Sequence, residues 1–179
     1  MCPDPQPPQE LLGVDVGLSQ HPPILETRTL HWPDEAACAA SAAVLAVALR
    51  ALPTAGDAFI ALHGPLGAGK TTFVRHLLHA LGVAGRIRSP SYALLEQHRA
   101  DDIEIAHLDF YRFGHAREWT DAGLRDVFAS PGLKLVEWPE NAAALLPPCD
   151  LSLHLRPVDA DEREVLVSAH SARGLALLP

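Results

Sequence analysis

The stretch Gly64-Pro65-Leu66-Gly67-Ala68-Gly69-Lys70-Thr71 decides the fold of this chain. It matches the phosphate-binding pattern G-x-x-x-x-G-K-[ST]. The short apolar run at residues 58–62 precedes it, and residues 71–81 have a helical pattern that Gly82 closes. A buried strand that passes through glycines into a helix is the context this motif requires. The stretch therefore predicts an α/β domain with a phosphate-binding loop, or P-loop.

Each residue type in the loop has a physical reason. Glycines allow the backbone to turn its N–H groups toward an anion, and the start of the following helix adds a positive dipole end. Lys70 brings a full charge to the β- and γ-phosphates, the Thr71 hydroxyl is a ligand for Mg²⁺, and Thr72 reaches the α-phosphate. A glycine-rich turn with an exposed lysine is the alternative interpretation. The predicted cofactor-binding residues of the loop are Leu66, Gly67, Ala68, Gly69, Lys70, Thr71 and Thr72.

The rest of the chain alternates predicted strands and helices, which is typical of a three-layer α/β fold with a central, mostly parallel sheet flanked by helices. Asp34 is a predicted N-cap for a helix over residues 35–52. Residues 1–25 contain six of the sixteen prolines and are predicted to be a flexible tail, which leaves residues 26–179 as one domain. The remaining predictions are strands at 27–30, 91–98, 103–108 and 133–136, a short helix within 119–128, and a C-terminal β-hairpin from 151–155 and 164–168.

A P-loop needs a second magnesium ligand, usually an acidic residue at the end of an apolar strand. Glu137 and Asp109 both hold such a position, and the residues alone do not decide between them. Magnesium prefers oxygen ligands and keeps waters, so one carboxylate could bind it directly and the other hold a water. Trp138 is a candidate to stack on adenine or on a partner, or to pack in the core. His76 and His79 are spaced to share a metal, although a solvated helix face is the simpler interpretation.

Composition narrows the class of protein. The chain has 179 residues, a net charge of −8 and a pI near 5.6, which makes it a poor stand-alone nucleic-acid binder because such binding depends on neutralising phosphates. Its three cysteines lie far apart, so neither a disulfide scaffold nor a cysteine zinc site is expected. The N-terminus lacks the pattern of a signal peptide and no apolar run is long enough to span a membrane. We therefore expect a cytoplasmic protein without a membrane anchor.

Four blocks together resemble the signature of the TsaE family, over roughly residues 26–170. They are Gly64 to Thr72, Ser89-Pro90-Ser91-Tyr92, His107-Leu108-Asp109-Phe110-Tyr111-Arg112 and Leu135-Val136-Glu137-Trp138-Pro139-Glu140. The resemblance implies an ATPase that uses ATP and Mg²⁺ and acts with a TsaB–TsaD-type heterodimer. Together they transfer a threonylcarbamoyl group to the adenosine beside the anticodon of tRNA. The transfer chemistry belongs to the partner, so tRNA is contacted only indirectly.

The resemblance also implies roles for single residues. Lys70, Asp109 and Glu137 are the candidate catalytic residues, with Thr71 and Glu137 as magnesium ligands. Asp109 would orient the attacking water or couple the nucleotide state to the partner, beside a switch-like loop at residues 89–91. Arg163 would contact nucleotide. The chain departs from the family at Ser91, Ala93 and Ala37, where threonine is usual.

Two other functions stay open at this point. A P-loop small-molecule kinase is the first, although the arginines are spread out and no lid-like insertion separates the blocks. A nucleotide-binding adaptor that scarcely hydrolyses ATP is the second. A GTPase is disfavoured because the guanine motif N-K-x-D is missing from the sequence.

Overall fold

The computed structural model describes residues 23–179. Nearly all of the predicted proline-rich tail at residues 1–25, together with Cys2, lies outside the described residues.

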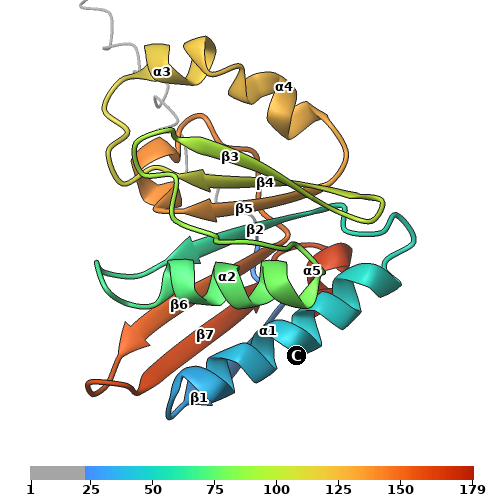
Figure 1. The fold of residues 1–179 in the computed structure, drawn as a ribbon, viewed down its shortest axis with the longest axis vertical. Helices are drawn as coiled ribbons and strands as arrows, with labels where there is room; N and C mark the ends of the chain where they lie inside the picture. Colours follow the sequence, from blue (N-terminus) through green and yellow to red (C-terminus); the bar gives the residue numbers. More distant parts are fainter. Residues whose placement is uncertain (1–22) are drawn as a thin grey trace, which may run out of the picture.

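A seven-stranded sheet in the order β1-β7-β6-β2-β5-β4-β3 forms the centre of the described domain (Figure 1). The four middle strands, β6, β2, β5 and β4, are parallel, whereas β1, β7 and β3 run antiparallel to their neighbours. The predicted central parallel sheet and C-terminal hairpin, β6 with β7, are thus confirmed. The strands are β1 (Glu26–Trp32), β2 (Ala58–His63), β3 (Leu95–Ala100), β4 (Ile103–Asp109), β5 (Leu133–Glu137), β6 (Leu151–Pro157) and β7 (Arg163–Ala169).

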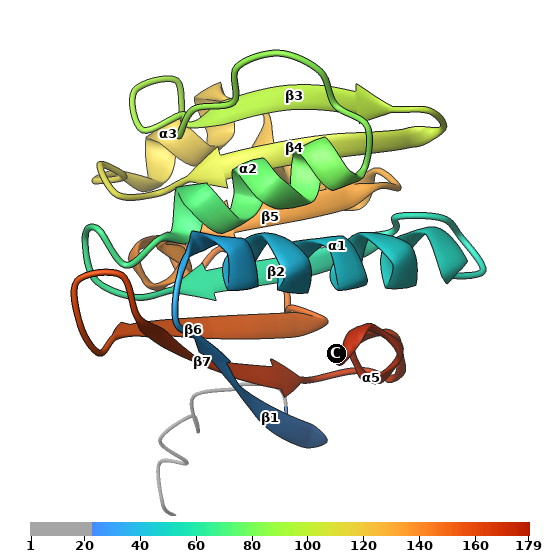
Figure 2. The same ribbon diagram turned by 60° about the horizontal axis from the view of Figure 1, so that its bottom comes forward.

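Helices cover both faces of the sheet. Helix α1 (Glu35–Ala51) and helix α2 (Lys70–Ala80) lie side by side on one face (Figure 2). Asp34 caps α1 as predicted, because its carboxylate accepts a hydrogen bond from the Ala37 N–H at 2.8 Å. The other face is covered by α3 (Ala116–Asp121), α4 (Leu124–Ala129) and the 3₁₀ helix η1 (Pro139–Ala142), while α5 (Ala172–Leu177) packs against β6 and β7.

Strand β2 shows how the sheet divides the core in two. Ala58, Ile60 and Leu62 point into the cluster formed with α1 and α2, and Phe59 and Ala61 point into the cluster formed with α4 and η1. This alternation is the two-residue period of a strand that is buried on both faces. The predicted phosphate-binding loop therefore follows a strand whose residues 58–62 are all buried.

Two predicted elements differ from the structure. The strand expected from residue 91 begins only at Leu95, because Leu94 has a left-handed backbone (φ 66°) and its N–H closes a turn onto the Pro90 carbonyl at 2.7 Å. The single helix expected within 119–128 is two helices, separated by Gly123 at φ 63°. Helix α5 was not predicted at all. None of the helices in residues 23–179 has the length and apolar character needed to cross a membrane.

Candidate functional site

The register of three parallel strands brings the predicted acids to one row. Asp109 at the end of β4 is paired with Glu137 at the end of β5, and Glu137 is paired with Leu62 of β2. Since β2 leads directly into the phosphate-binding loop, both carboxylates lie beside the start of α2. Ligands of open parallel sheets bind at this carboxyl edge.

A cavity of about 390 Å³ lies at this edge. It is lined by every predicted site residue except Arg163: Leu66, Gly67, Ala68, Gly69, Lys70, Thr71, Thr72, Asp109, Glu137 and Trp138. It is also lined by Ser89, Ser91, Tyr111 and Arg112. Tyr111 and Arg112 stand in the block that contains Asp109, and that position was the signal that could have identified them.

The backbone of the loop needs glycine at its first position. Gly64 has φ 138°, and a Cβ there would lie 2.5 Å from the carbonyl oxygen of Leu155 in β6. A side chain would therefore push β6 away from the loop. Gly69, at φ 104°, turns the chain into α2, whose eleven residues begin at Lys70. The loop thus ends at a helix N-terminus, which attracts anions.

Lys70 lies inside the cavity with its charge held by the loop itself. Its Nζ donates to the carbonyl oxygens of Gly64 at 2.5 Å and Pro65 at 3.0 Å, and lies 3.8 Å from the centroid of the Trp138 ring. Burial lowers the pKa of Lys70, although the carboxylates of Glu137, Glu140 and Asp109 oppose that shift. A cation in this position interacts strongly with any anion that enters, because water screens it poorly.

Thr71 and Glu137 form the most direct contact of the site. The Thr71 hydroxyl lies 3.0 Å and 2.9 Å from the two carboxylate oxygens of Glu137. The buried His107 ring donates from Nε2 to the same carboxylate at 2.9 Å. Sequence reasoning gave His107 no role, although its place two residues before Asp109 on β4 puts both side chains on one side of the strand.

Asp109 holds the loop that precedes β3. One of its oxygens accepts a hydrogen bond from the Ser89 hydroxyl, and the other accepts from the Tyr111 N–H at 2.8 Å. Asp109 is only 4% exposed, so both bonds lie inside the cavity wall. The segment predicted to be switch-like is therefore attached to the carboxylate predicted to sense nucleotide.

Trp138 projects over the cavity from an unusual backbone. Its φ is 57°, in the left-handed region, and its N–H donates to the Leu62 carbonyl at 3.3 Å. Its ring contacts Lys70 on one side and lies 5.0 Å from the Tyr111 ring, centroid to centroid. The ring thus covers the lysine end of the cavity, and stacking on adenine stays a prediction.

Arg163 lies on the other side of the loop. Its guanidinium donates to the Ala68 carbonyl at 3.0 Å and lines a smaller cavity of about 150 Å³. That cavity and the larger one share four lining residues, Gly67, Ala68, Gly69 and Thr72. The two cavities therefore lie on either side of one loop, and Arg163 borders the second.

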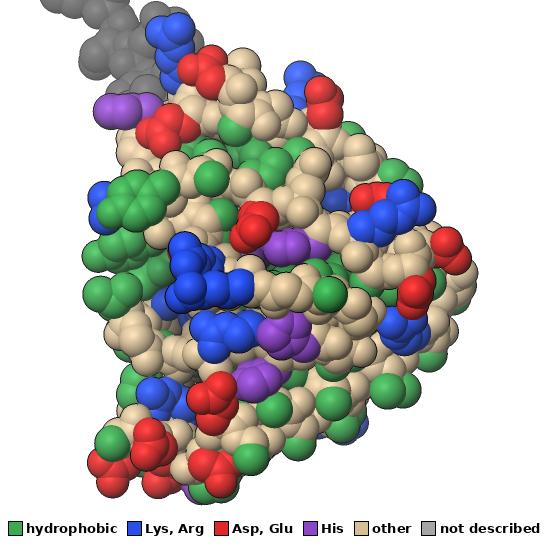
Figure 3. Space-filling view, in the orientation of Figure 1, with side chains coloured by type: hydrophobic (Ala, Val, Ile, Leu, Met, Phe, Trp, Pro, Cys, Tyr) green, Lys and Arg blue, Asp and Glu red, His purple; other side chains and the backbone are tan. Residues whose placement is uncertain are grey.

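Basic side chains gather next to Thr71. Figure 3 shows Lys, Arg and His side chains close together over the region of α2. A cavity of about 530 Å³ beside Thr71 is bordered by Arg75, His79, Arg86 and Arg88. His79 contacts the Gly85 carbonyl at 3.1 Å whereas His76 pairs with Glu35 at 2.9 Å, and these separate partners support the simpler interpretation over a shared metal.

Comparison with known proteins gives consistent matches. Residues 32–165 match the family model described as "Threonylcarbamoyl adenosine biosynthesis protein TsaE". The chain is 33% identical over 150 residues to the tRNA threonylcarbamoyladenosine biosynthesis protein TsaE of Haemophilus influenzae, covering 84% of this chain and 94% of the relative. It is 33% identical over 110 residues to the Bacillus subtilis protein of the same name, covering 62% and 68%. The crystal structure of Bacillus subtilis YdiB matches with a TM-score of 0.68 at 27% identity, covering 85% of this chain and 91% of that one.

Proposed function

Because the chain belongs to the TsaE family, we propose that it serves tRNA threonylcarbamoyladenosine biosynthesis as a magnesium-dependent ATPase. The observation that carries the proposal is the contact between the Thr71 hydroxyl and both oxygens of Glu137, at 3.0 and 2.9 Å. It lies at the end of a phosphate-binding loop, with Lys70 and Asp109 in the same cavity.

The residues present suit ATP with Mg²⁺. Thr71 and Glu137 supply oxygen donors, the kind that Mg²⁺ prefers. A bound Mg²⁺ would neutralise charge on the β- and γ-phosphates. The phosphates themselves would lie in the loop, where backbone N–H groups and the N-terminus of α2 favour negative charge. The smaller cavity beside Arg163 is then a natural place for the nucleoside end, because it adjoins the loop on the other side.

The chain's own groups account for the remaining steps. Lys70, held by the carbonyls of Gly64 and Pro65, exchanges those partners for phosphate oxygens. Asp109 orients the attacking water and takes up its proton, since it is a buried carboxylate that lines the cavity. The Trp138 ring shields the lysine end of the cavity from bulk water.

The partner in this proposal is a TsaB–TsaD-type heterodimer. Two exposed side chains near the cavity are candidates to contact it. Tyr92 is 86% exposed and Leu66 is 74% exposed. Leu66 borders the cavity, and Tyr92 follows the loop that Ser89 attaches to Asp109. A change at the γ-phosphate can therefore move a surface aromatic residue. Exposed aromatic side chains are common anchors at protein interfaces.

The net charge of −8 argues that tRNA is reached through that partner rather than directly. A cytoplasmic location belongs to the same proposal. The free thiols of Cys38 and Cys149 suit a reducing compartment.

Labelled ATP distinguishes the candidate functions. We expect slow phosphate release by the protein alone, and faster release with the partner pair and tRNA, together with repeated rounds of tRNA modification. Transfer of the label to a small metabolite would support a kinase instead. Nucleotide binding without hydrolysis under every condition would support an adaptor. Multiple-turnover modification that continues when the protein is omitted would overturn the proposal.

A further inference from the structure

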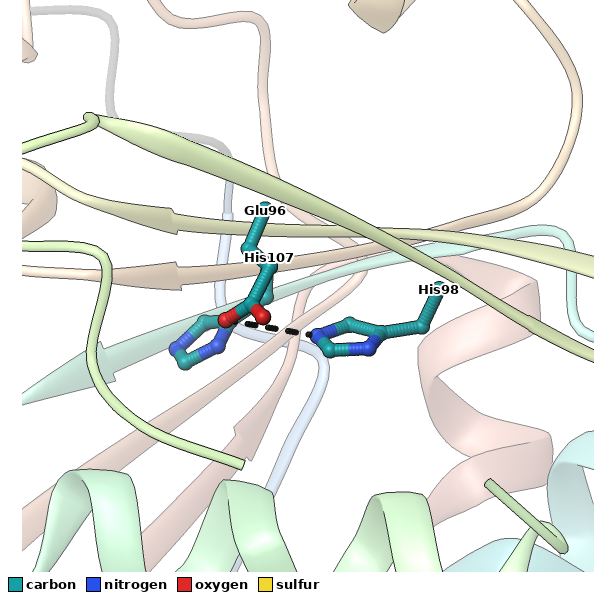
Figure 4. Close-up of side chains that lie close together, drawn as sticks. All are labelled: Glu96, His98 and His107. Carbon is teal, nitrogen blue, oxygen red and sulfur yellow. Dashed lines mark ion pairs between the residues drawn. The ribbon is translucent and has the colours of Figure 1, made fainter. Parts of the chain in front are cut away.

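A second group of possible metal ligands is connected to the Thr71–Glu137 contact through His107. Glu96 and His98 of β3 and His107 of β4 each place one ligand atom within 4.8 Å of the others (Figure 4). Glu96 and His98 share a face of β3, and Glu96 is the direct register partner of His107. Within residues 23–179, this is the one group of three His, Cys, Asp or Glu side chains with such spacing.

Two nitrogens of this group are buried without a partner. They are Nε2 of His98 and Nδ1 of His107. Buried polar atoms are hydrogen-bonded in the great majority of cases, so two adjacent exceptions need a physical explanation. Nε2 of His98 lies 3.7 Å from a Glu96 oxygen, which is too long for a hydrogen bond.

The contact with Glu137 favours one tautomer of the His107 imidazole. A carboxylate oxygen accepts hydrogen bonds, so its 2.9 Å contact with Nε2 favours the tautomer with the N–H at Nε2, in which the unpartnered Nδ1 presents a lone pair to the group. Histidines that bind metal usually donate their other N–H to a carboxylate in this way. Glu137 thus prepares His107 as a ligand.

We propose that Glu96, His98 and His107 bind a divalent transition-metal ion of the zinc type, at a site separate from the one proposed for magnesium. Two imidazole nitrogens and one carboxylate oxygen suit zinc and its first-row neighbours, whereas Mg²⁺ favours oxygen ligands. Three protein ligands leave one tetrahedral position for water.

The three ligand atoms must move slightly closer together to bind one zinc ion. Ligand atoms around tetrahedral zinc are about 3.3 Å apart, given bonds of about 2.0–2.1 Å. Because all three ligand atoms lie within 4.8 Å of one another, no pair must approach by more than roughly 1.5 Å. Glu96 can supply the movement of its own carboxylate because its side chain is 41% exposed and β3 is an edge strand of the sheet. A metal ion would enter past the exposed side of Glu96, since the His98 side chain is 10% exposed and that of His107 is fully buried.

The test is a titration of the nucleotide-free protein with Zn²⁺ by calorimetry and with Co²⁺ by visible absorption, in excess Mg²⁺. We expect one ion per chain and the intense Co²⁺ absorption of a tetrahedral site. Glu96→Gln and His98→Gln should each weaken binding by at least about tenfold and abolish that absorption. Neither variant alters a group assigned to ATP.

His31→Gln is the matched control, because His31 and Glu162 form an exposed His–carboxylate pair at 2.5 Å. It should leave the affinity unchanged. Circular dichroism shows whether the variants fold, and Glu96→Gln, on an exposed edge, is the substitution least able to disturb folding. The proposal is overturned if Glu96→Gln folds and binds Zn²⁺ like the wild type, or if His31→Gln loses as much affinity. The assay contains neither ATP nor a partner, so its outcome is independent of the proposed ATPase activity.

Discussion

Glu137→Gln tests the centre of the candidate site. The substitution keeps the shape of a side chain that is only 2% exposed and removes its charge. In the structure both carboxylate oxygens meet the Thr71 hydroxyl, and one also accepts from His107. Glutamine replaces one of the two oxygens with an NH₂ group that cannot accept. At least one hydrogen bond to a charged group is therefore lost.

The lost hydrogen bond gives the expected decrease in the rate of phosphate release. A hydrogen bond to a charged group contributes about 1.5–3 kcal/mol. At about 1.4 kcal/mol for each factor of ten, the rate of magnesium-dependent phosphate release should fall by roughly 10- to 150-fold. The Mg²⁺ concentration for half-maximal rate should rise, while magnesium-free ATP binding should change little. Hard cations prefer the charged carboxylate to the neutral amide.

The assay is phosphate release across a series of Mg²⁺ concentrations, with calorimetry for ATP binding. Glu104→Gln is the control, because Glu104 lies on β4 with a side chain that is 63% exposed. It should behave like the wild type. If Glu137→Gln hydrolyses ATP at the wild-type rate with the same magnesium requirement, Glu137 is only an acid at the end of a strand.

Three further predictions concern other residues. Lys70→Ala should weaken ATP binding in calorimetry and abolish phosphate release, because the phosphates lose a buried cation; unchanged hydrolysis would refute the P-loop assignment. Asp109→Ala should still bind ATP but lose multiple-turnover tRNA modification with the partner pair, measured as modified nucleoside per partner complex over time. Wild-type turnover would remove the role given to Asp109. Burial raises the pKa of Cys38 to about 12 and of Cys149 to about 11. Iodoacetamide at pH 8 should therefore label both thiols far more slowly in the folded protein than in denaturant, by mass spectrometry. Rapid labelling of folded Cys38 would contradict that burial.

The elements that were predicted correctly depend on patterns among residues close together in the sequence. The apolar run of β2, the glycines after it and Asp34 before α1 are each determined by neighbouring residues, and all appear where expected. Asp109 and Glu137 were found because each ends an apolar strand. Their pairing in one row depends on the sheet order, which no local pattern contains.

What was missed depends on contacts distant in sequence. Helix α5 has only six residues, and its position is set by close packing: a Cβ on Gly174 would lie 1.9 Å from the Asp150 carbonyl oxygen. Its local signal was Ser171, which caps the helix by accepting from the Gly174 N–H. The group formed by Glu96, His98 and His107 exists only because of the β3–β4 register. Sequence spacing instead drew attention to histidines of α2 that have separate partners.

The left-handed backbone of Trp138 has a consequence for which residues position 138 can accept. A left-handed conformation costs an L-residue other than glycine roughly 1–2 kcal/mol, and asparagine and aspartate tolerate it best. Those residues would satisfy the backbone but would remove the ring that lies 3.8 Å from Lys70. Under the proposed ATPase function, folding and activity therefore favour different side chains at position 138. A library of substitutions at this position, scored separately for thermal stability and for phosphate release, should rank the amino acids in two different orders.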